Sequence, residues 1–319
     1  METIIQILAR ELGQKEQYVE NVVKLLDDGN TVPFIARYRK EMHGTMDDQT
    51  IRQLADRLAY LRGLDERRAE VRDAIEAQGK LTDELAAAIA QAQTLAALDD
   101  LYRPYRPKRR TRASIAREKG LEPLAAAITA ARTPSPALEA LAKPYIAPEK
   151  GVETAEDALA GAGDIIAEDL SDDANLRGRL RALLHRTGVL KTAGTDKDDT
   201  VYAMYHDFSE PVHRLQSHRV LAINRGEKEG KLKVTLEADE NEAIAAVTRA
   251  ALHPKNPFGD WLRAVCADSW NRLLFPSLER ETRSELTDAA NEQAIRTFAL
   301  NLRPLLMQPP VRGRVTLGF

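Results

Sequence analysis

A dense group of cationic side chains lies within residues 98–124, LDDLYRPYRPKRRTRASIAREKGLEPL, and two tyrosines, Tyr102 and Tyr105, alternate with it. The cations are Arg103, Arg106, Lys108, Arg109, Arg110 and Arg112. Clustered arginine and lysine side chains supply the electrostatic part of nucleic-acid binding, and the guanidinium fork fits phosphate oxygens. The tyrosine rings could stack on bases. The segment therefore predicts a phosphate-contacting element.

The same residues are also compatible with a solvated loop that has no ligand. In that alternative the arginines pair with nearby acids such as Asp99 and Asp100, and the tyrosines anchor the loop to the core. Pro104 and Pro107 lack a backbone donor and disfavour helix at the residue before them, so we expect a short non-helical connector here. A helix over residues 94–101 precedes it, and helical pattern returns from Ala113. Both alternatives stay open at this stage.

A second cationic group follows a helical pattern near the N-terminus. Apolar spacing predicts helices over residues 4–12 and 15–26, a turn at residues 27–30, and a third helix from residue 31. The third helix carries Arg37, Arg39 and Lys40. Two helices joined by a short turn, with cations on the following helix, indicate a helix-turn-helix-like unit. Most helix pairs of this kind bind no DNA, so the pattern alone is weak.

Composition limits the other classes of function. The chain has 319 residues, 43% of them hydrophobic, and a net charge of −3, which is typical of a globular protein with two or more domains. Any attraction to polyanions must therefore come from local patches. No apolar run reaches the length of a membrane span, which predicts a cytoplasmic protein without a membrane partner. With one cysteine, Cys266, and no recognisable nucleotide, metal or nucleophile motif, we expect no catalysis and no cofactor.

The predicted fold class is mainly α and multi-helical. A helix over residues 48–77 has an all-charged middle at residues 65–68, which suggests that it bridges two lobes, and a long helical tract covers residues 261–302. Alternation at residues 231–237 predicts one small β element. The predicted segments are 1–195 (N-terminal helical region with the helix-turn-helix-like part), 196–240 (small mixed α/β segment), 241–310 (long central helices) and 311–319 (first strand of a further domain).

Four stretches carry a family resemblance. They are the cationic segment, TVPFIARYRKE at residues 31–41, LAINRGEKEG at 221–230 and SLERETRSEL at 277–286. In this order they resemble the Tex family of bacterial transcription accessory proteins, and the terminal GRVTLGF resembles the start of that family's RNase H-like (YqgF-type) domain. The resemblance implies a cytoplasmic nucleic-acid-binding factor linked to transcription, with long central helices and further domains, among them an RNA-binding one, beyond this region.

The first hypothesis is a transcription accessory factor in which this chain contacts phosphates of RNA or DNA without sequence preference, with the transcription machinery as a further partner. Its site comprises the two cationic groups, and Arg225 and Lys228 are further candidates. The alternative is a structural and protein-interaction scaffold, with nucleic-acid binding in other domains. Arginines paired with Asp99, Asp100 or Glu118 would favour the scaffold, whereas exposed, unpaired arginines would be available to phosphate.

Overall fold

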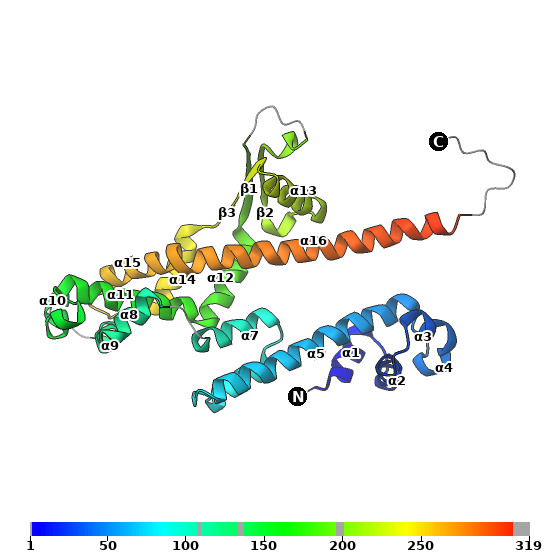
Figure 1. Ribbon diagram of the computed structural model, residues 1–319, viewed down its shortest axis with the longest axis horizontal. Coiled ribbons are helices and arrows are strands. Elements are labelled where there is room, and N and C mark those ends of the chain that lie inside the picture. The colour runs from blue at the N-terminus through cyan, green and yellow to red at the C-terminus, as the bar shows by residue number, and fades with distance from the viewer. Residues whose placement is uncertain (1, 107–109, 133–136, 196–200, 309–319) are drawn as a thin grey trace. The chain divides into compact units, whose positions relative to one another are not determined.

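The computed structural model describes residues 2–106, 110–132, 137–195 and 201–308, and the chain divides into two compact units between Arg106 and Pro107 (Figure 1). The fold is mainly α with one small sheet, as the sequence predicts. The predicted boundaries at residues 195, 240 and 310 remain predictions, and segment 311–319 lies outside the described residues. No helix in the described ranges is long and apolar enough to span a membrane.

Unit 1 is entirely helical in its described part. Its elements are α1 (Ile4–Leu12), α2 (Glu16–Asp27), α3 (Val32–Tyr38), α4 (Lys40–His43), α5 (Asp48–Glu76), α6 (Asp83–Gln91), α7 (Leu95–Tyr102) and a 3₁₀ turn (Arg103–Tyr105). The predicted helices over 4–12, 15–26 and 48–77 are confirmed to within one residue at each end. Asp47 begins α5 because its side chain accepts a hydrogen bond from the amide of Thr50 at 2.8 Å.

Helix α5 links two separate hydrophobic clusters. Its first half, up to Leu61, packs with α1, α2 and α3, and its second half, from Leu64 to Ile75, packs with α6 and α7. The all-charged residues 65–68 follow Leu64, the first residue of the second cluster, and Arg67 and Arg68 are partly buried. Helix α5 therefore contributes to two clusters within this unit, and the bridge between two lobes stays a prediction.

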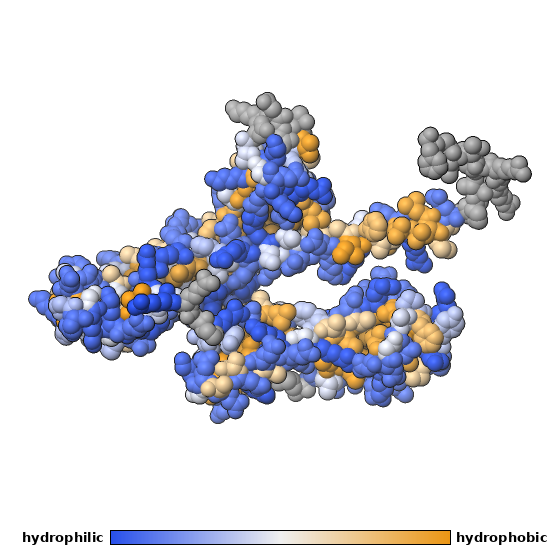
Figure 2. Space-filling view, viewed as in Figure 1, coloured by the Kyte–Doolittle hydropathy of each residue, from blue (hydrophilic) through white to orange (hydrophobic). Residues whose placement is uncertain are grey.

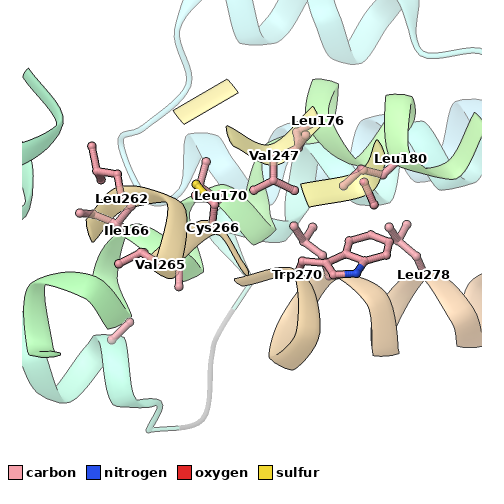
Figure 3. Packing of buried hydrophobic residues seen from close by; sticks show 14 of the residues in the cluster. Ile166, Leu170, Leu176, Leu180, Val247, Leu262, Val265, Cys266, Trp270 and Leu278 are labelled. Carbon is pink, nitrogen blue, oxygen red and sulfur yellow. The ribbon is translucent and has the colours of Figure 1, made fainter. Parts of the chain in front are cut away.

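Unit 2 contains a larger helical core and the sheet. Its helices are α8 (Arg112–Glu118), α9 (Glu122–Ala130), α10 (Leu138–Ala142), α11 (Ala155–Asp172), α12 (Ala174–Thr187), α13 (Ser217–Lys228), α14 (Glu240–Ala251), α15 (Gly259–Ser269) and α16 (Phe275–Leu306). Side chains of α11, α12, α14, α15 and the start of α16 meet in one cluster, where Leu170, Leu180 and Trp270 are buried (Figure 3).

The sheet has three antiparallel strands in the order β2-β1-β3, with bounds β1 (Val189–Gly194), β2 (Asp207–Pro211) and β3 (Leu232–Glu237). Strand β3 alternates between buried and exposed residues, so the predicted β element is confirmed. Strands β1 and β2 are not predicted by the sequence pattern. The exposed positions of β1 are Lys191, Ala193 and Gly194. From Lys191 on, the sequence therefore reads as the start of a polar segment and not as a strand.

The tract predicted over residues 261–302 is two helices joined by a π-helical turn, Trp270–Leu274. Pro276 follows this turn in the first turn of α16, and because the helical backbone is continuous through the turn, its missing N–H removes one hydrogen bond of the helix at this point.

Candidate nucleic-acid interface

Three cations near the end of α3 and the start of α4 form the first candidate site. We call Arg37, Arg39 and Lys40 the α3–α4 cation group. Pro33 lies in the first turn of α3, and the helix is interrupted at Arg39, whose φ of −127° and ψ of 36° are not helical. The chain resumes as α4 at Lys40, so the three cations lie at and on both sides of one backbone break.

All three cations are exposed, and no carboxylate of the described residues forms an ion pair with any of them. The Arg39 guanidinium carbon lies 5.4 Å from the centre of the Phe34 ring. That ring lies 5.3 Å from the ring of Tyr38, whose exposed fraction is 59%. A cation over an aromatic face is held in position without losing its charge. The group therefore offers unneutralised donors next to an exposed ring.

The backbone beneath this group is fixed by unit 1's core. Ile35 is fully buried, and the Asn21 side-chain amide donates to the carbonyl of Met42 at 3.0 Å, which ties α4 to α2. Helix α4 ends at Gly44, which has a φ of 64°. A Cβ atom at Gly44 would lie 2.7 Å from the ring of Tyr18, closer than packed carbon atoms approach. Only glycine fits this exit without a shift of its neighbours.

The cationic segment begins within unit 1 with arginines that are engaged. Arg106 pairs with Asp99 at 2.8 Å and lies 5.5 Å from the Tyr102 ring centre. Arg67 of α5 contacts the same carboxylate at 3.0 Å and the same ring at 5.6 Å. Burial alone would raise the pKa of Asp99, but the hydrogen bonds from Arg67 and Arg106 outweigh it and lower that pKa. Arg106 therefore has a structural role here.

One local expectation in this segment is wrong. Arg103 precedes a proline, which predicts a non-helical backbone, yet its φ of −53° and ψ of −44° are helical. Pro104 sits in the first turn of the 3₁₀ helix, where no backbone donor is needed, so the turn tolerates it. Arg106, before Pro107, is extended as predicted. Arg103 itself is partly buried and makes interactions within the protein.

The end of the cationic segment belongs to unit 2. Arg110 pairs with Glu118 at 3.2 Å, and both side chains are more than 60% exposed, so this pair contributes little to stability. Arg112 is the first residue of α8, behind a Thr111–Ser114 capping box, and is exposed without an ion-pair partner among the described residues. Lys108 and Arg109 lie outside the described residues.

The two remaining candidates lie on α13. Arg225 and Lys228 are exposed, and neither forms an ion pair in the part of the chain that the structure describes. Between them Glu227 is engaged by Arg283 of α16. These two cations are therefore a separate, smaller group in unit 2. The described ranges hold no cluster of three or more histidine, cysteine or carboxylate side chains that could bind a metal ion.

Phe34 and Tyr38, the aromatic residues beside the α3–α4 cation group, were not predicted as candidates from the sequence. Their spacing of four residues places them on one face of α3, and that spacing is readable in TVPFIARYRK. Aromatic residues at helical spacing usually belong to a core, so this spacing alone does not predict a binding surface.

Comparison with known proteins identifies two matching families. Residues 2–76 match the Tex-like protein N-terminal domain, and residues 133–298 match the family described as Tex central region-like. "Protein tex" of Bordetella pertussis is 45% identical over 99% of this chain and 42% of its own length. "Transcriptional accessory protein Tex" of Neisseria gonorrhoeae is 40% identical over 99% of this chain and 42% of its own length. "S1 RNA-binding domain-containing protein 1" of Homo sapiens is 28% identical over 99% and 33%, respectively. The chain thus spans less than half the length of these relatives.

Proposed function

Because the chain belongs to the Tex family, we propose that it serves a transcription accessory protein as a module that contacts nucleic-acid phosphates without reading sequence. The observation that carries the proposal is the α3–α4 cation group, which is exposed, has no ion-pair partner among the described residues and lies beside exposed Tyr38. The names of the relatives support it, since one is a transcriptional accessory protein and another is an S1 RNA-binding domain-containing protein. A role in transcription would place the protein in the cytoplasm.

Phosphate contact follows from the state of these side chains. An arginine already paired with a carboxylate must break that pair before it meets a phosphate, whereas Arg37, Arg39 and Lys40 need only give up water. Contacts to the backbone position a protein on a strand and carry no sequence information. The exposed ring of Tyr38 adds a stacking surface for a base, and such stacking contributes about 1–3 kcal/mol per base.

Cations of unit 2 extend this proposal. Arg112, Arg225 and Lys228 are exposed without ion-pair partners in the described ranges, and the solvent-exposed Arg110–Glu118 pair is weak enough for phosphate to compete with it. Arg106 is left out because Asp99 engages it. We propose no catalytic step and no cofactor for the chain.

Fluorescence anisotropy with labelled single-stranded RNA and duplex DNA tests the proposal. The variant Arg37→Gln/Arg39→Gln/Lys40→Gln removes three unpaired charges. We expect its affinity to fall by roughly tenfold or more at moderate salt, because fewer counterions are released when phosphate contacts are lost.

A matched control removes the same number of positive charges from unit 1. Arg10, Lys24 and Arg52 are exposed and pair with Glu2, Glu20 and Asp48. We expect Arg10→Gln/Lys24→Gln/Arg52→Gln to change the affinity by less than about threefold, since paired surface charges contribute little. An equal loss in both variants would show that only net charge matters and would contradict the proposed site.

A second candidate function is the scaffold alternative, in which the long helices hold further domains. It is favoured by the end of α16, where residues 291–306 are all exposed although several are large and apolar.

A further inference from the structure

The imidazole ring of His43 is a buried polar group in unit 1. His43 is the last residue of α4, and its exposed fraction is 2%. Neither ring nitrogen has a hydrogen-bond partner among the residues that the structure describes. A neutral imidazole has one donor and one acceptor, and burying both without partners costs free energy. Packing alone does not explain this ring, since an apolar side chain would avoid that cost.

The backbone around His43 holds the cations of the α3–α4 group in place. The amide of His43 donates to the carbonyl of Arg39 at 3.2 Å. The next amide, that of Gly44, donates to the carbonyl of Lys40 at 3.1 Å. A helix as short as α4 is not stable by itself, so it depends on its contacts with the rest of unit 1. Burial of the His43 ring is therefore part of what keeps this turn closed.

The charged groups of the described helices around His43 offer no buried counter-ion to a protonated ring. Helix α4 packs against α2 and α3. On α3 and α4 the charged side chains are the α3–α4 cation group and Glu41, which is exposed. The α2 residues that lie against α4 and its end are Tyr18 and Asn21, and neither is anionic near neutral pH. The charged side chains of α2 and of the start of α5 are all exposed: Glu16, Glu20, Lys24, Asp27, Asp47 and Asp48.

An imidazolium at this position would be a buried charge without a partner, and such a charge is strongly disfavoured unless the group reaches water. We propose that His43 is a pH-sensitive switch: protonation of its ring opens α4 and removes the fixed arrangement of the cations that contact phosphate. An imidazole in water binds a proton near about pH 6.5, and closed α4 excludes that proton. The closed form is therefore favoured above this pH and loses stability as the pH falls. The effect on nucleic-acid affinity rests on the proposed function, whereas the opening of α4 does not.

The predicted effect on affinity has the opposite sign to that of simple electrostatics. Acidification makes the protein more positive, and a more positive protein binds phosphates more tightly. Opening of α4 weakens binding instead. A variant without an ionisable group at position 43 shares every other titrating group with the wild type, so the ratio of the two affinities isolates the switch.

Hydrogen exchange at the amides of residues 42–44 measures the opening without a ligand, because these amides donate the backbone hydrogen bonds of α4. In the 319-residue chain we expect them to open about tenfold more often at about pH 5.5 than at about pH 7.5, after correction for the intrinsic pH dependence of exchange. The amides of α6, in the other cluster of unit 1, should not follow this response.

Three variants assign the response to the buried ring. His43→Leu keeps a side chain suited to the core, and His43→Gln keeps a polar side chain that does not titrate. We expect neither to show the pH response of α4. His218→Leu is the matched control, because His218 is exposed on α13, where the surface of unit 2 is mainly hydrophilic (Figure 2). This control should retain the full response.

Fluorescence anisotropy with labelled single-stranded RNA measures the consequence for binding. We expect the wild type and His43→Leu to bind equally at about pH 7.5. At about pH 5.5 we expect the wild type to bind at least about threefold more weakly than the variant, since only the wild type opens α4.

Two results would overturn the inference. The first is exchange of α4 that does not respond to pH in the wild type, or that responds equally in His43→Leu and His43→Gln. The second is equal affinity of the wild type and these variants at both pH values. A wild type that binds no nucleic acid at about pH 7.5 would contradict the proposed function and leave the exchange measurement unchanged, so the two proposals fail separately.

Discussion

Arginines in two regions of the molecule occupy opposite environments. On α12 of unit 2, Arg177 is fully buried and, with Arg181, engages Glu281 of α16. In unit 1, Arg37 and Arg39 face solvent, and no ion-pair partner is found for them in the described ranges. The same side chain serves packing in one place and is available to a ligand in the other. The two environments differ in whether a carboxylate lies within ion-pair distance of the guanidinium group. The density of arginines along the sequence does not reveal this difference.

The largest effect is expected from a substitution that breaks an ion pair of the buried arginine. Glu281→Ala removes one counter-ion of the fully buried Arg177; because the Glu281 side chain is itself 32% exposed, we expect a loss at the lower end of the about 3–5 kcal/mol that breaking a buried pair costs. We expect that loss in the free energy of unfolding of unit 2, measured by urea denaturation. On the same helix Glu292 pairs with Arg296 at an exposed site, so Glu292→Ala should cost less than about 1 kcal/mol. Similar losses in the two variants would contradict a structural role for Arg177.

The next effect concerns the backbone that presents the exposed cations. Gly44→Ala places a Cβ atom against the Tyr18 ring at a φ that only glycine adopts readily, and we expect a loss of about 2–3 kcal/mol in the stability of unit 1. Gly13 has a nearly equal φ of 63° but a ψ of 32°, in the left-handed region, whereas the ψ of Gly44 is −120°. A methyl group added at Gly13 would meet nothing within 4 Å, so Gly13→Ala should cost only about 1 kcal/mol. Equal thermal unfolding midpoints for the two variants would rule out the contact with Tyr18 as a constraint on α4.

The smallest effect tests the intermediate case, Arg106, which belongs to the cationic segment yet pairs with Asp99. The pKa of Asp99 is lowered in the folded state, so its contribution to stability is present above its ordinary pKa and is lost as the pH falls through the folded value. In Arg106→Gln the pKa of Asp99 should rise and the loss of stability at acid pH should shrink. The stability at neutral pH should fall by less than about 1 kcal/mol.

An NMR titration of the Asp99 carboxyl carbon measures this directly. Arg72→Gln is the control, because Arg72 pairs with exposed Asp73 and makes no ion pair with Asp99. An unchanged pKa of Asp99 in Arg106→Gln would show that Arg106 does not engage this carboxylate. Arg106 would then count among the arginines available to phosphate.

The helices of both units were predictable because apolar residues recur at helical spacing over long stretches, as in α5. Two strands were not, because β1 buries only Leu190 and Thr192 and its partner strands begin further along the chain, at Asp207 and Leu232. The environment of the arginines was equally hidden. Arg177 and Glu281 are separated by 104 positions, so only the fold brings them together. The choice between engaged and available arginines at residues 103–112 therefore required the structure, and the helix-turn-helix-like nature of α2 and α3 stays a prediction.

The salt dependence of binding tests the central claim most directly. The logarithm of the association constant falls linearly with the logarithm of salt concentration, with a slope of about −0.7 per phosphate contact on a single strand and about −0.9 on duplex DNA. If Arg37, Arg39 and Lys40 each contact a phosphate, replacing all three by glutamine should reduce the magnitude of the slope by about 2 on RNA and about 3 on duplex DNA. An unchanged slope, with or without weaker binding, would show that these cations do not contact phosphate and would contradict the account.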